Sequence, residues 1–251
     1  MKVFITGVSD GIGRELAKQL VGAGHIVWGV ARREELLKEI QSELGADKFL
    51  FTKCDVGNEN DVENAVKLMR SADFLPDVVV LNAAVFYPDA DSLYKHPVFK
   101  RVMEINVNGS LIWIDKFLGD FLNRKSGSFI AISSVSAYLP NINSISYSAS
   151  KAALSMAFKS LRMRYQKNGV GFSAVYFGPV ATKLIPFWSS ETKGLKDLFI
   201  ISREEAAGKI LKVINSAGGD YWFPFFTTLF FRAVSFQADI FTAFYGYFKN
   251  K

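Results

Sequence analysis

Short apolar runs alternate with amphipathic stretches along most of the chain. Runs such as DVVVLN and SFIAIS are continuously hydrophobic, as is typical of parallel strands whose two faces are both covered by helices. They predict strands near residues 2–6, 26–31, 48–53, 78–82, 128–133, 171–177 and 220–224. The stretches between them predict helices near residues 12–22, 33–44, 59–71, 99–122, 147–167 and 203–216.

This alternation predicts an α/β fold with a doubly wound parallel sheet. A chain of 251 residues with 49% hydrophobic and 22% charged residues can bury one sizeable core, and no Pro/Ser-rich linker or repeat divides it. We therefore predict a single domain. Residues 1–224 form its sheet and helices, and residues 225–251 add an apolar, aromatic-rich helical extension to the same domain.

The first predicted strand, KVFIT, runs directly into a turn that contains Gly7, Gly11 and Gly13 and precedes a helical stretch. Glycines let the backbone turn sharply and approach a pyrophosphate, whose charge is favoured by the free amides and the dipole of a helix N-terminus. A glycine cluster alone could be a plain turn. Its place between a strand and a helix favours dinucleotide binding.

Three side chains further along suggest proton chemistry. Tyr147 and Lys151 are four residues apart, so the phenol and the ammonium would lie on one helix face. A nearby cation favours the phenolate, and we therefore expect Lys151 to lower the pKa of Tyr147 and make it a general acid or base. Ser134 ends an apolar strand, at the edge where open α/β sheets bind ligands, and could hydrogen-bond a substrate oxygen. Taken alone, the Tyr-x-x-x-Lys pair could equally be an exposed helix pair.

Together, TGVSDGIG at residues 6–13, Ser134, Tyr147 and Lys151 resemble the short-chain dehydrogenase/reductase family, and the resemblance extends from residue 2 to about residue 224. It implies a Rossmann-like sheet of seven strands and an oxidoreductase that uses a nicotinamide dinucleotide. It also implies a role for Asn106, whose backbone carbonyl would hold a water that links the lysine to solvent. The implied catalytic residues are Asn106, Ser134, Tyr147 and Lys151.

The resemblance further implies which segments contact the cofactor. Residues 82–84 (Asn-Ala-Ala) resemble the family's Asn-Ala-Gly, and residues 55–56 (Asp-Val) match the pair that meets the adenine. FGPVATKL, at residues 177–184, resembles Pro-Gly-x-x-x-Thr, which binds the nicotinamide carboxamide, although a phenylalanine replaces the proline. The implied cofactor-binding set is Gly7, Ser9, Asp10, Gly11, Ile12, Gly13, Arg32, Arg33, Asp55, Val56, Asn82, Ala83, Ala84, Tyr147, Lys151, Gly178, Val180 and Thr182.

The end of the second predicted strand bears on which dinucleotide is used. Ala31 stands where an acidic residue would bind the ribose hydroxyls of NAD, and Arg32 and Arg33 follow it. A guanidinium is suited to a phosphate, so we predict that NADP(H) is preferred over NAD(H). Asp10 complicates this prediction, because some NADP-preferring members of the family have a basic residue there. The two arginines could also merely solvate a helix start.

Residues 183–201, where the family places a variable substrate lid, are rich in large apolar residues. They favour an apolar or amphipathic carbonyl or alcohol as the substrate, although these side chains could also complete the core. Residues 221–251 are unusually aromatic, and Arg232 and Asp239 within them disfavour a membrane-spanning helix. This segment could pack on its own domain or across a dimer interface, lie at a membrane surface, or wall a tunnel for a long substrate.

Charge and composition narrow the remaining possibilities. The net charge of +6 is spread among acidic residues without a dense basic run, so we expect no nucleic-acid partner. Cys54 is the only cysteine, and His25 and His96 are the only histidines, so we expect neither a disulfide nor a metal site. MKVFITG already begins the first strand, which leaves no signal peptide. We expect a cytoplasmic protein, or one peripheral at a membrane surface, that forms a homodimer or homotetramer as the resemblance implies.

The sequence therefore predicts an NADP(H)-dependent oxidoreductase that interconverts a carbonyl and an alcohol on an apolar or amphipathic substrate. One alternative is a non-catalytic scaffold or regulator that binds NADP(H), because the same fold can bind a nucleotide without turnover. The presence of both Tyr147 and Lys151 at the family spacing argues against it. Another alternative is a lipid or sterol carbonyl reductase that works at a membrane surface.

Overall fold

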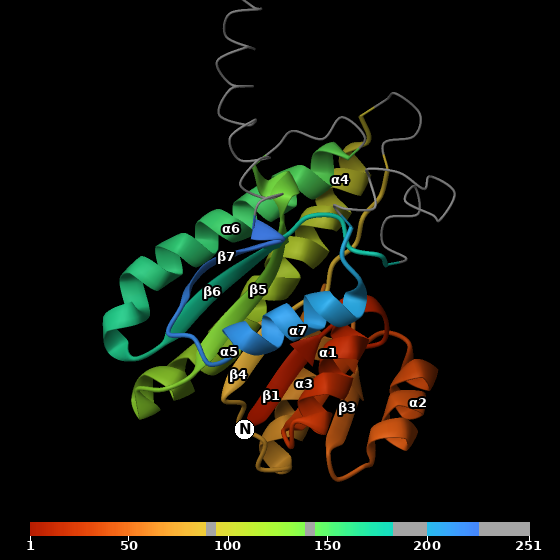
Figure 1. The fold of residues 1–251 in the computed structure, drawn as a ribbon, viewed down its shortest axis with the longest axis vertical. Coiled ribbons are helices and arrows are strands. Elements are labelled where there is room, and N and C mark those ends of the chain that lie inside the picture. Colours follow the sequence, from red (N-terminus) through yellow and green to blue (C-terminus); the bar gives the residue numbers. More distant parts are fainter. Residues whose placement is uncertain (89–93, 139–143, 183–199, 226–251) are drawn as a thin grey trace, which may run out of the picture.

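The computed structural model describes residues 1–88, 94–138, 144–182 and 200–225. Within these ranges the chain forms one all-parallel sheet of seven strands, as predicted, and the strand order is β3-β2-β1-β4-β5-β6-β7 (Figure 1). The strands are β1 (Lys2–Thr6), β2 (Ile26–Ala31), β3 (Phe49–Lys53), β4 (Val78–Leu81), β5 (Ser128–Ser134), β6 (Gly171–Phe177) and β7 (Gly219–Phe223).

Helices connect the strands and cover both faces of the sheet. They are α1 (Gly11–Gly22), α2 (Glu34–Leu44), α3 (Glu59–Ser71), α4 (His96–Met103), α5 (Gly109–Arg124), α6 (Ile145–Tyr165) and α7 (Arg203–Val213). Within the described ranges, a π turn, η1 (Glu104–Asn108), and two short 3-10 turns, η2 (Val135–Ala137) and η3 (Gln166–Asn168), accompany these helices. Asp10, Asn58 and Ser202 accept backbone hydrogen bonds as the N-caps of α1, α3 and α7.

Two hydrophobic clusters lie on opposite faces of the sheet. One packs α1, α2 and α7 against the sheet, and the other packs α3, α5 and α6 against the other face (Figure 1). Alternate residues of one strand enter different clusters, since Val3 and Ile5 belong to the first and Phe4 to the second. This arrangement is why the strands read as continuous apolar runs.

The direction of the sheet changes between β1 and β4. β1 pairs with β2 on one side, with Thr6 opposite Val30, and with β4 on the other, with Thr6 opposite Leu81. The connections that leave the carboxyl ends of β1 and β4 therefore run to opposite sides of the sheet. In open α/β sheets this switch point leaves a crevice in which ligands bind.

The helix predicted over residues 99–122 is wrong in detail, because the structure divides it into α4, η1 and α5. The buried Asn106 side chain bonds to the backbone of Val85 and to Ser150 instead of following a regular helix surface. Gly109 lies so close to the segment after β3 that a Cβ there would be 2.8 Å from the Val56 carbonyl oxygen. These tertiary contacts accompany the π turn in the middle of the amphipathic stretch.

A partly buried ion pair joins β7 to α6. Arg162 Nη2 lies 2.9 Å from Asp220 Oδ1, and the two side chains are only 18% and 14% exposed. Lys159 Nζ lies 3.9 Å from the other carboxylate oxygen of Asp220. The last strand of the sheet is therefore tied to α6 by charge as well as by backbone pairing.

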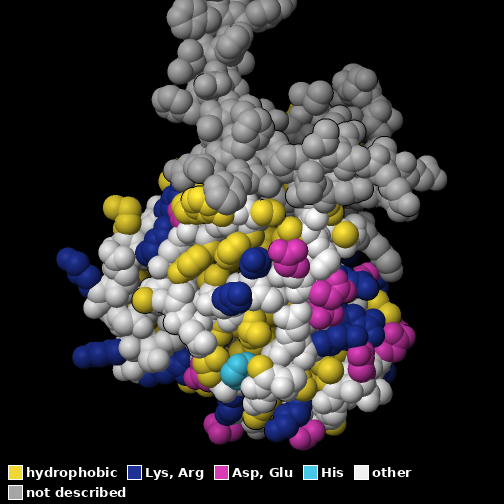
Figure 2. All heavy atoms as spheres, viewed as in Figure 1, with side chains coloured by type: hydrophobic (Ala, Val, Ile, Leu, Met, Phe, Trp, Pro, Cys, Tyr) yellow, Lys and Arg dark blue, Asp and Glu magenta, His cyan; other side chains and the backbone are white. Residues whose placement is uncertain are grey.

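On the face shown in Figure 2, basic and acidic side chains are interspersed over the described surface. None of the helices in the described ranges is both long enough and apolar enough to span a membrane. Residues 183–199, which are most of the predicted lid, and residues 226–251 of the predicted aromatic extension lie outside the described residues.

Candidate functional site

A cavity of about 550 Å³ lies at the carboxyl ends of β1, β2 and β4, at the switch point of the sheet. Its walls come from the glycine turn after β1, the end of β2, the segment after β3 and the segment after β4. The predicted cofactor residues that line it are Gly7, Ser9, Asp10, Gly11, Ile12, Arg32, Arg33, Asp55, Val56, Asn82, Ala83, Ala84 and Thr182. Gly13, Tyr147, Lys151, Gly178 and Val180 are not among its lining residues.

The glycine turn is built around a close approach between β1 and β4. Gly7 has a φ of +71°, which favours glycine, and a Cβ there would lie 2.7 Å from Ala83 Cα. Gly13 does not line the cavity, but a Cβ on it would lie 2.6 Å from Asn82 Nδ2 and would also meet the Gly7 carbonyl oxygen. The absence of side chains at these positions lets α1 begin directly under the turn.

Asn82 fixes the glycine turn to β4. Its Nδ2 donates to the carbonyl oxygens of Thr6 and Gly7 at 3.1 and 3.0 Å. The Thr6 hydroxyl oxygen in turn accepts from the backbone amides of Asn82 and Ala83, each at 3.0 Å. Thr6 is absent from the predicted site, although its place directly before Gly7 could have suggested it.

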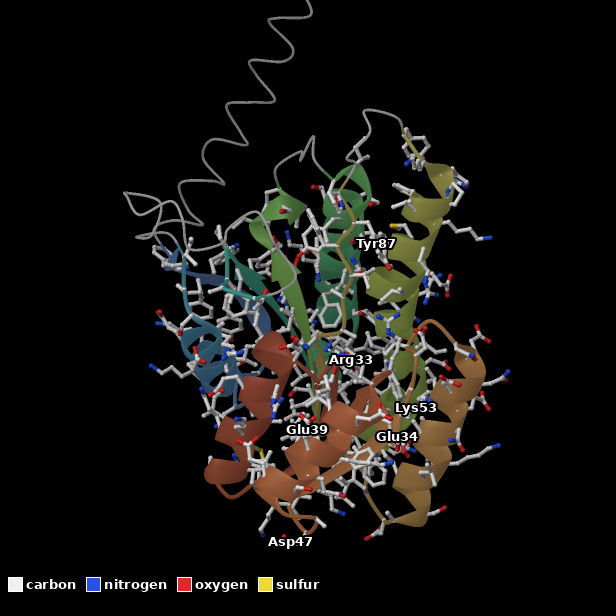
Figure 3. All side chains as sticks on the ribbon, turned by 90° about the vertical axis from the view of Figure 1, so that its right-hand side faces the viewer. Arg33, Glu34, Glu39, Asp47, Lys53 and Tyr87 are labelled. Carbon is white, nitrogen blue, oxygen red and sulfur yellow. The ribbon has the colours of Figure 1, made fainter. Side chains whose placement is uncertain are left out.

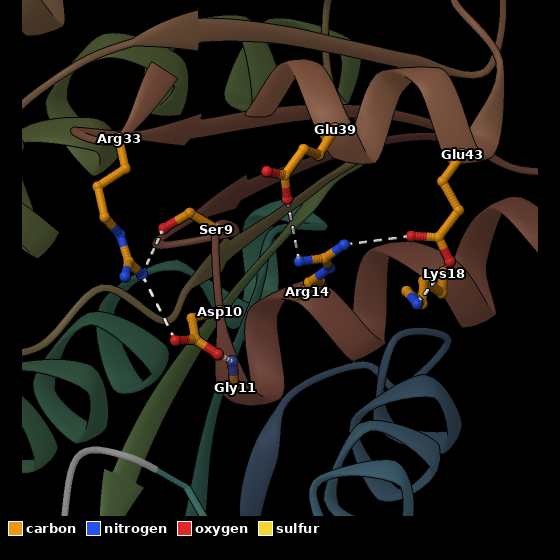
Figure 4. Close-up of polar contacts among 8 residues, drawn as sticks. All are labelled: Ser9, Asp10, Gly11, Arg14, Lys18, Arg33, Glu39 and Glu43. Atoms are coloured by element: carbon orange, nitrogen blue, oxygen red, sulfur yellow. Dashed lines mark hydrogen bonds and ion pairs between the residues drawn. The ribbon is translucent and has the colours of Figure 1, made fainter. Parts of the chain in front are cut away.

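Arg33 reaches from the end of β2 to the glycine turn (Figure 4). Its Nη2 donates to Ser9 Oγ at 3.1 Å and lies 3.6 Å from Asp10 Oδ2. The other carboxylate oxygen of Asp10 accepts from the Gly11 amide at 2.8 Å. Arg14 turns away from this group and pairs with acidic residues of α2 (Figure 4). A guanidinium and a carboxylate thus meet at one end of the cavity.

Asp55 lies at the wall formed by the segment after β3. Its carboxylate accepts from the Gly57 amide at 3.0 Å and from Arg101 Nη2 at 2.9 Å. Burial alone would raise the pKa of Asp55, but these hydrogen bonds and the charges of Arg101 and Arg32 outweigh it and hold the pKa below its usual value. Asp55 therefore remains ionised next to the cavity at neutral pH.

Ser134, Tyr147 and Lys151 come together at the carboxyl end of β5 and the start of α6. Tyr147 is 7% exposed and Lys151 is 3% exposed, so the pair is not an exposed helix pair. Lys151 Nζ lies 5.5 Å from the centre of the Tyr147 ring and donates to the Ile132 carbonyl oxygen at 2.8 Å. The two residues thus share one buried site, as the helical spacing predicts.

The prediction that Lys151 lowers the pKa of Tyr147 is wrong for this structure. Burial raises the pKa of Tyr147 to about 12, although the neighbouring Ser134 hydroxyl favours the phenolate and opposes this in part. Burial also lowers the pKa of Lys151 to about 8. The ammonium is engaged with the Ile132 carbonyl, and desolvation of both groups dominates.

Asn106 is fully buried and acts through its side chain. Its Oδ1 accepts from the Val85 amide at 2.8 Å, and its Nδ2 donates to the Val85 carbonyl and to Ser150 Oγ, each at 3.0 Å. Its backbone carbonyl, where the resemblance implies a water, accepts from Ser110 Oγ at 3.1 Å. Asn106 therefore joins the segment after β4 to α6, one residue before Lys151.

Aromatic residues after β4 connect the cavity to Tyr147. Phe86 and Tyr87 line the cavity, and the Phe86 ring meets the Tyr147 ring edge-on at 5.3 Å between centroids. In Figure 3, Tyr87 lies above Arg33, and both residues line the cavity. These aromatic residues are absent from the predicted site, although only Val85 separates them from the Asn-Ala-Ala triplet.

The turn after β6 lies beside the glycine turn. The Gly178 amide donates to the Phe223 carbonyl at 3.0 Å, and Val180 forms a parallel bridge with Ile201. A Cβ on Gly11 would lie 3.5 Å from Thr182 Cγ2, so Thr182 closes the cavity near the start of α1. The predicted residues of this turn are thus brought next to the other cofactor residues.

The part of the chain that the structure describes contains no group of three metal-ligating side chains. Cys54 lines the cavity, but it is 1% exposed, and burial together with the charges of Asp61 and Asp55 raises its pKa to about 12. The cavity is instead lined by the backbone at the N-terminus of α1, by the glycine turn, and by Arg32 and Arg33. Such a set is suited to the phosphates of a dinucleotide.

Comparisons of the chain with known proteins agree with this arrangement. A family model described as short chain dehydrogenase matches residues 1–193. A fatty acyl-CoA reductase of Acinetobacter baylyi is 31% identical over 217 residues, which cover 84% of this chain and 72% of that protein. A hydroxysteroid 11-beta-dehydrogenase 1-like protein of Xenopus tropicalis is 32% identical over 243 residues, which cover 92% of this chain and 82% of that protein.

Solved structures share the fold at lower sequence identity. A serine dehydrogenase in its closed form, complexed with NADP+, has a TM-score of 0.79 at 22% identity, over 88% of this chain and 94% of that one. A 3-ketoacyl-(acyl-carrier-protein) reductase from Brucella melitensis, complexed with NADH, also has a TM-score of 0.79, at 21% identity, over 88% of this chain and 96% of that one. At these identities the likeness concerns the fold alone.

Proposed function

This chain belongs to the short-chain dehydrogenase family, and from that premise we propose that it is an NADP(H)-dependent oxidoreductase that interconverts a carbonyl and an alcohol. The observation that carries the proposal is the group of Ser134, Tyr147 and Lys151, in which Tyr147 and Lys151 are buried. This group adjoins, through Phe86, a cavity with a glycine turn and two arginines. The group of Ser134, Tyr147 and Lys151 supplies proton transfer, and the cavity supplies a dinucleotide site.

The proposal gives a distinct role to each of Ser134, Tyr147, Lys151 and Asn106. Tyr147, with its raised pKa, remains a phenol at neutral pH and donates its proton to the substrate oxygen during reduction. Ser134 donates a hydrogen bond to the same oxygen and orients it. Lys151 returns a proton to the tyrosine, and its pKa of about 8 suits proton exchange near neutrality. Asn106 positions the helix that carries both residues.

The cofactor supplies or accepts a hydride when it is bound. The glycine turn and the start of α1 would hold its pyrophosphate, and residues 55–56 and 82–84 would line its adenosine half. Residues 178–182 would bind the nicotinamide carboxamide, and Lys151 would bind the neighbouring ribose. These assignments follow the family motifs, and the shared cavity supports most of them.

The preference for NADP(H) is supported by the end of β2. Arg32 and Arg33 both line the cavity, and Ala31 provides no carboxylate for a ribose hydroxyl. Similar folds are found complexed with NADP+ and with NADH. The choice of dinucleotide therefore depends on such side chains and not on the fold.

An apolar or amphipathic substrate is supported by two observations. Phe86 packs against Tyr147, so an aromatic surface adjoins the proposed proton donor. The names of two relatives refer to a fatty acyl-CoA, which is amphipathic, and to a hydroxysteroid, which is largely apolar. We also propose that the protein is a cytoplasmic homodimer or homotetramer, since members of this family usually form oligomers. Light scattering of the purified protein tests the oligomeric state.

Tyr147→Phe tests the catalytic proposal. We expect this variant to lose turnover of an apolar ketone by at least about a hundredfold, the usual contribution of a general acid, while NADPH affinity changes little. Tyr165→Phe, at the far end of the same helix, is the matched control and should keep full activity. Turnover by Tyr147→Phe at the wild-type rate would remove Tyr147 from the proton-donor role.

A second candidate function is a lipid carbonyl reductase that works at a membrane surface. It is supported by the aromatic sequence of residues 221–251 and by the lipid-like substrates that the two relatives are named for. Co-sedimentation of the full chain with anionic and neutral vesicles tests it, with Lys249→Glu and Lys251→Glu combined as the variant. Failure of the wild type to sediment with either kind of vesicle would contradict this candidate.

A further inference from the structure

The backbone of Lys151 is held by a serine of its own helix. Ser155, which lies one turn further along α6, donates from its Oγ to the Lys151 carbonyl oxygen at 2.7 Å. The same Oγ lies 2.8 Å from the Oγ of Ser133, which belongs to β5. A hydroxyl has one proton, and Ser155 gives it to the carbonyl, so Ser133 is the donor between the two serines. A chain of hydrogen bonds therefore runs from β5 through Ser155 to the backbone of Lys151.

This chain meets β5 beside the two other contacts that the proposed reaction needs. Ser133 lies between Ile132, whose carbonyl accepts from Lys151 Nζ at 2.8 Å, and Ser134, which would bind the substrate oxygen. Lys151 is thus tied to β5 directly through its ammonium group and also through its backbone, by way of Ser155. The two ties fix both ends of the lysine side chain relative to Ser134.

The local preference of the helix does not explain Ser155. A serine whose hydroxyl bonds to the carbonyl four residues earlier is slightly unfavourable inside a helix, and alanine is the better helix former. Ser155 and Ser133 are each only 4% exposed, so both hydroxyls have also given up water. The benefit of the pair therefore lies in the tie between α6 and β5. Positions that break a local preference in this way are expected at functional sites.

We propose that Ser155 is a positioning residue that acts through Lys151: together with Ser133, it sets the place of the ammonium group relative to Ser134 and the cofactor. The inference rests on the proposed function, in which Lys151 returns a proton to Tyr147 and binds the nicotinamide ribose. Ser155 itself touches neither substrate nor cofactor. Its loss should therefore slow the reaction of the bound complex and leave the affinity for the ketone nearly unchanged.

Ser155→Ala is the direct test, because it removes the hydroxyl and keeps the helix. A displacement of about 1 Å in a catalytic arrangement can cost about a hundredfold in rate, and the loss of one hydrogen bond should permit a smaller displacement. We therefore expect kcat for an apolar ketone at saturating NADPH to fall about tenfold, while KM for the ketone changes by less than about twofold. Ser155→Thr keeps a hydroxyl that can bond to the same carbonyl, and it should restore kcat to within about twofold of the wild type.

Ser173→Ala is the matched control. Ser173 is fully buried on β6, and its Oγ lies 3.3 Å from Ser216 Oγ, so it too pairs with a second serine. This pair joins β6 to the segment after α7, whereas Ser133 and Ser155 join β5 to α6. We expect urea unfolding to show a loss of stability in both alanine variants, and kcat of Ser173→Ala to stay within about twofold of the wild type. All rates are measured at a temperature at which every variant is folded.

A double-mutant cycle tests whether the two serines act together. We expect Ser133→Ala to lower kcat as well, and the double alanine variant to be no slower than the slower single variant. The inference would be overturned by an unchanged kcat in Ser155→Ala, by no recovery in Ser155→Thr, by an equal fall in Ser173→Ala, or by losses that multiply in the double variant. Each of these results would leave the proposed function standing, because the wild type still turns over. Absence of ketone turnover by the wild type would count against both.

Discussion

The buried ammonium of Lys151 should make stability depend on pH above pH 8. The side chain is 3% exposed, and burial lowers its pKa from the usual 10.5 to about 8. Between these two values the unfolded chain holds a proton that the folded protein has lost. The free energy of unfolding therefore rises with pH across this window. The full difference between the two pKa values corresponds to about 3 kcal/mol.

Lys151→Met removes the titrating group and keeps a flexible apolar side chain of similar length. Urea unfolding of both proteins at pH 7, 8, 9 and 10 gives the difference in unfolding free energy at each pH. We expect this difference to shift in favour of the wild type by roughly 2–3 kcal/mol from pH 7 to pH 10. The pH dependence of all other groups cancels in the comparison.

Lys38→Met is the control, because pairing with Glu34 raises the pKa of Lys38 instead of lowering it. The contribution of such a group is complete below the unfolded value, so its difference should stay nearly constant from pH 7 to pH 10. A difference for Lys151→Met that also stayed constant would refute the reasoning. It would mean that the hydrogen bond to the Ile132 carbonyl compensates the ammonium for its burial.

Three further changes probe the packing around the site and the reactivity of its thiol. Gly13→Ala would place a Cβ 2.6 Å from Asn82 Nδ2. We therefore expect the free energy of unfolding in urea to fall by about 1–3 kcal/mol and NADPH to bind more weakly. Unchanged stability would contradict this. Arg162→Met would remove the partner that lies 2.9 Å from the mostly buried Asp220 carboxylate. We expect the free energy of unfolding in the same assay to fall by about 1–3 kcal/mol. A decrease below about 0.5 kcal/mol would show that the pair is dispensable. Cys54, with its pKa raised to about 12, should react with a disulfide reagent at pH 8 only after unfolding, and rapid reaction of the native protein would contradict its burial.

The sequence predicts the sheet well because its strands carry their own signal. The run SFIAISS is apolar throughout most of its length, since both faces of β5 are covered, and it forms the predicted strand up to Ser134. The continuous helix over residues 99–122 was wrong because its interruption depends on Val85, which is distant in the chain from Asn106. Periodicity reports which residues face a core, and it does not report a hydrogen bond between distant segments.

The candidate site, like the fold, can be predicted from the sequence only in part. Helical spacing is enough to place Tyr147 and Lys151 together, but the direction of their pKa changes depends on burial and on the carbonyl of Ile132. Likewise, two adjacent arginines predict a cation at the end of β2. Only the folded chain shows that Arg33 meets Ser9.

The order of strands in the sheet has a consequence for how the chain acquires its structure during synthesis. β1 lies inside the sheet, yet β4, which covers one of its edges, begins only at Val78. Until β4 has left the ribosome, β1 has one unpaired edge, and such an edge can pair with another chain and lead to aggregation. This edge of β1 is therefore an aggregation hazard until Leu81 has emerged. The nucleotide cavity, which lies between the ends of β1 and β4, can form only after that point.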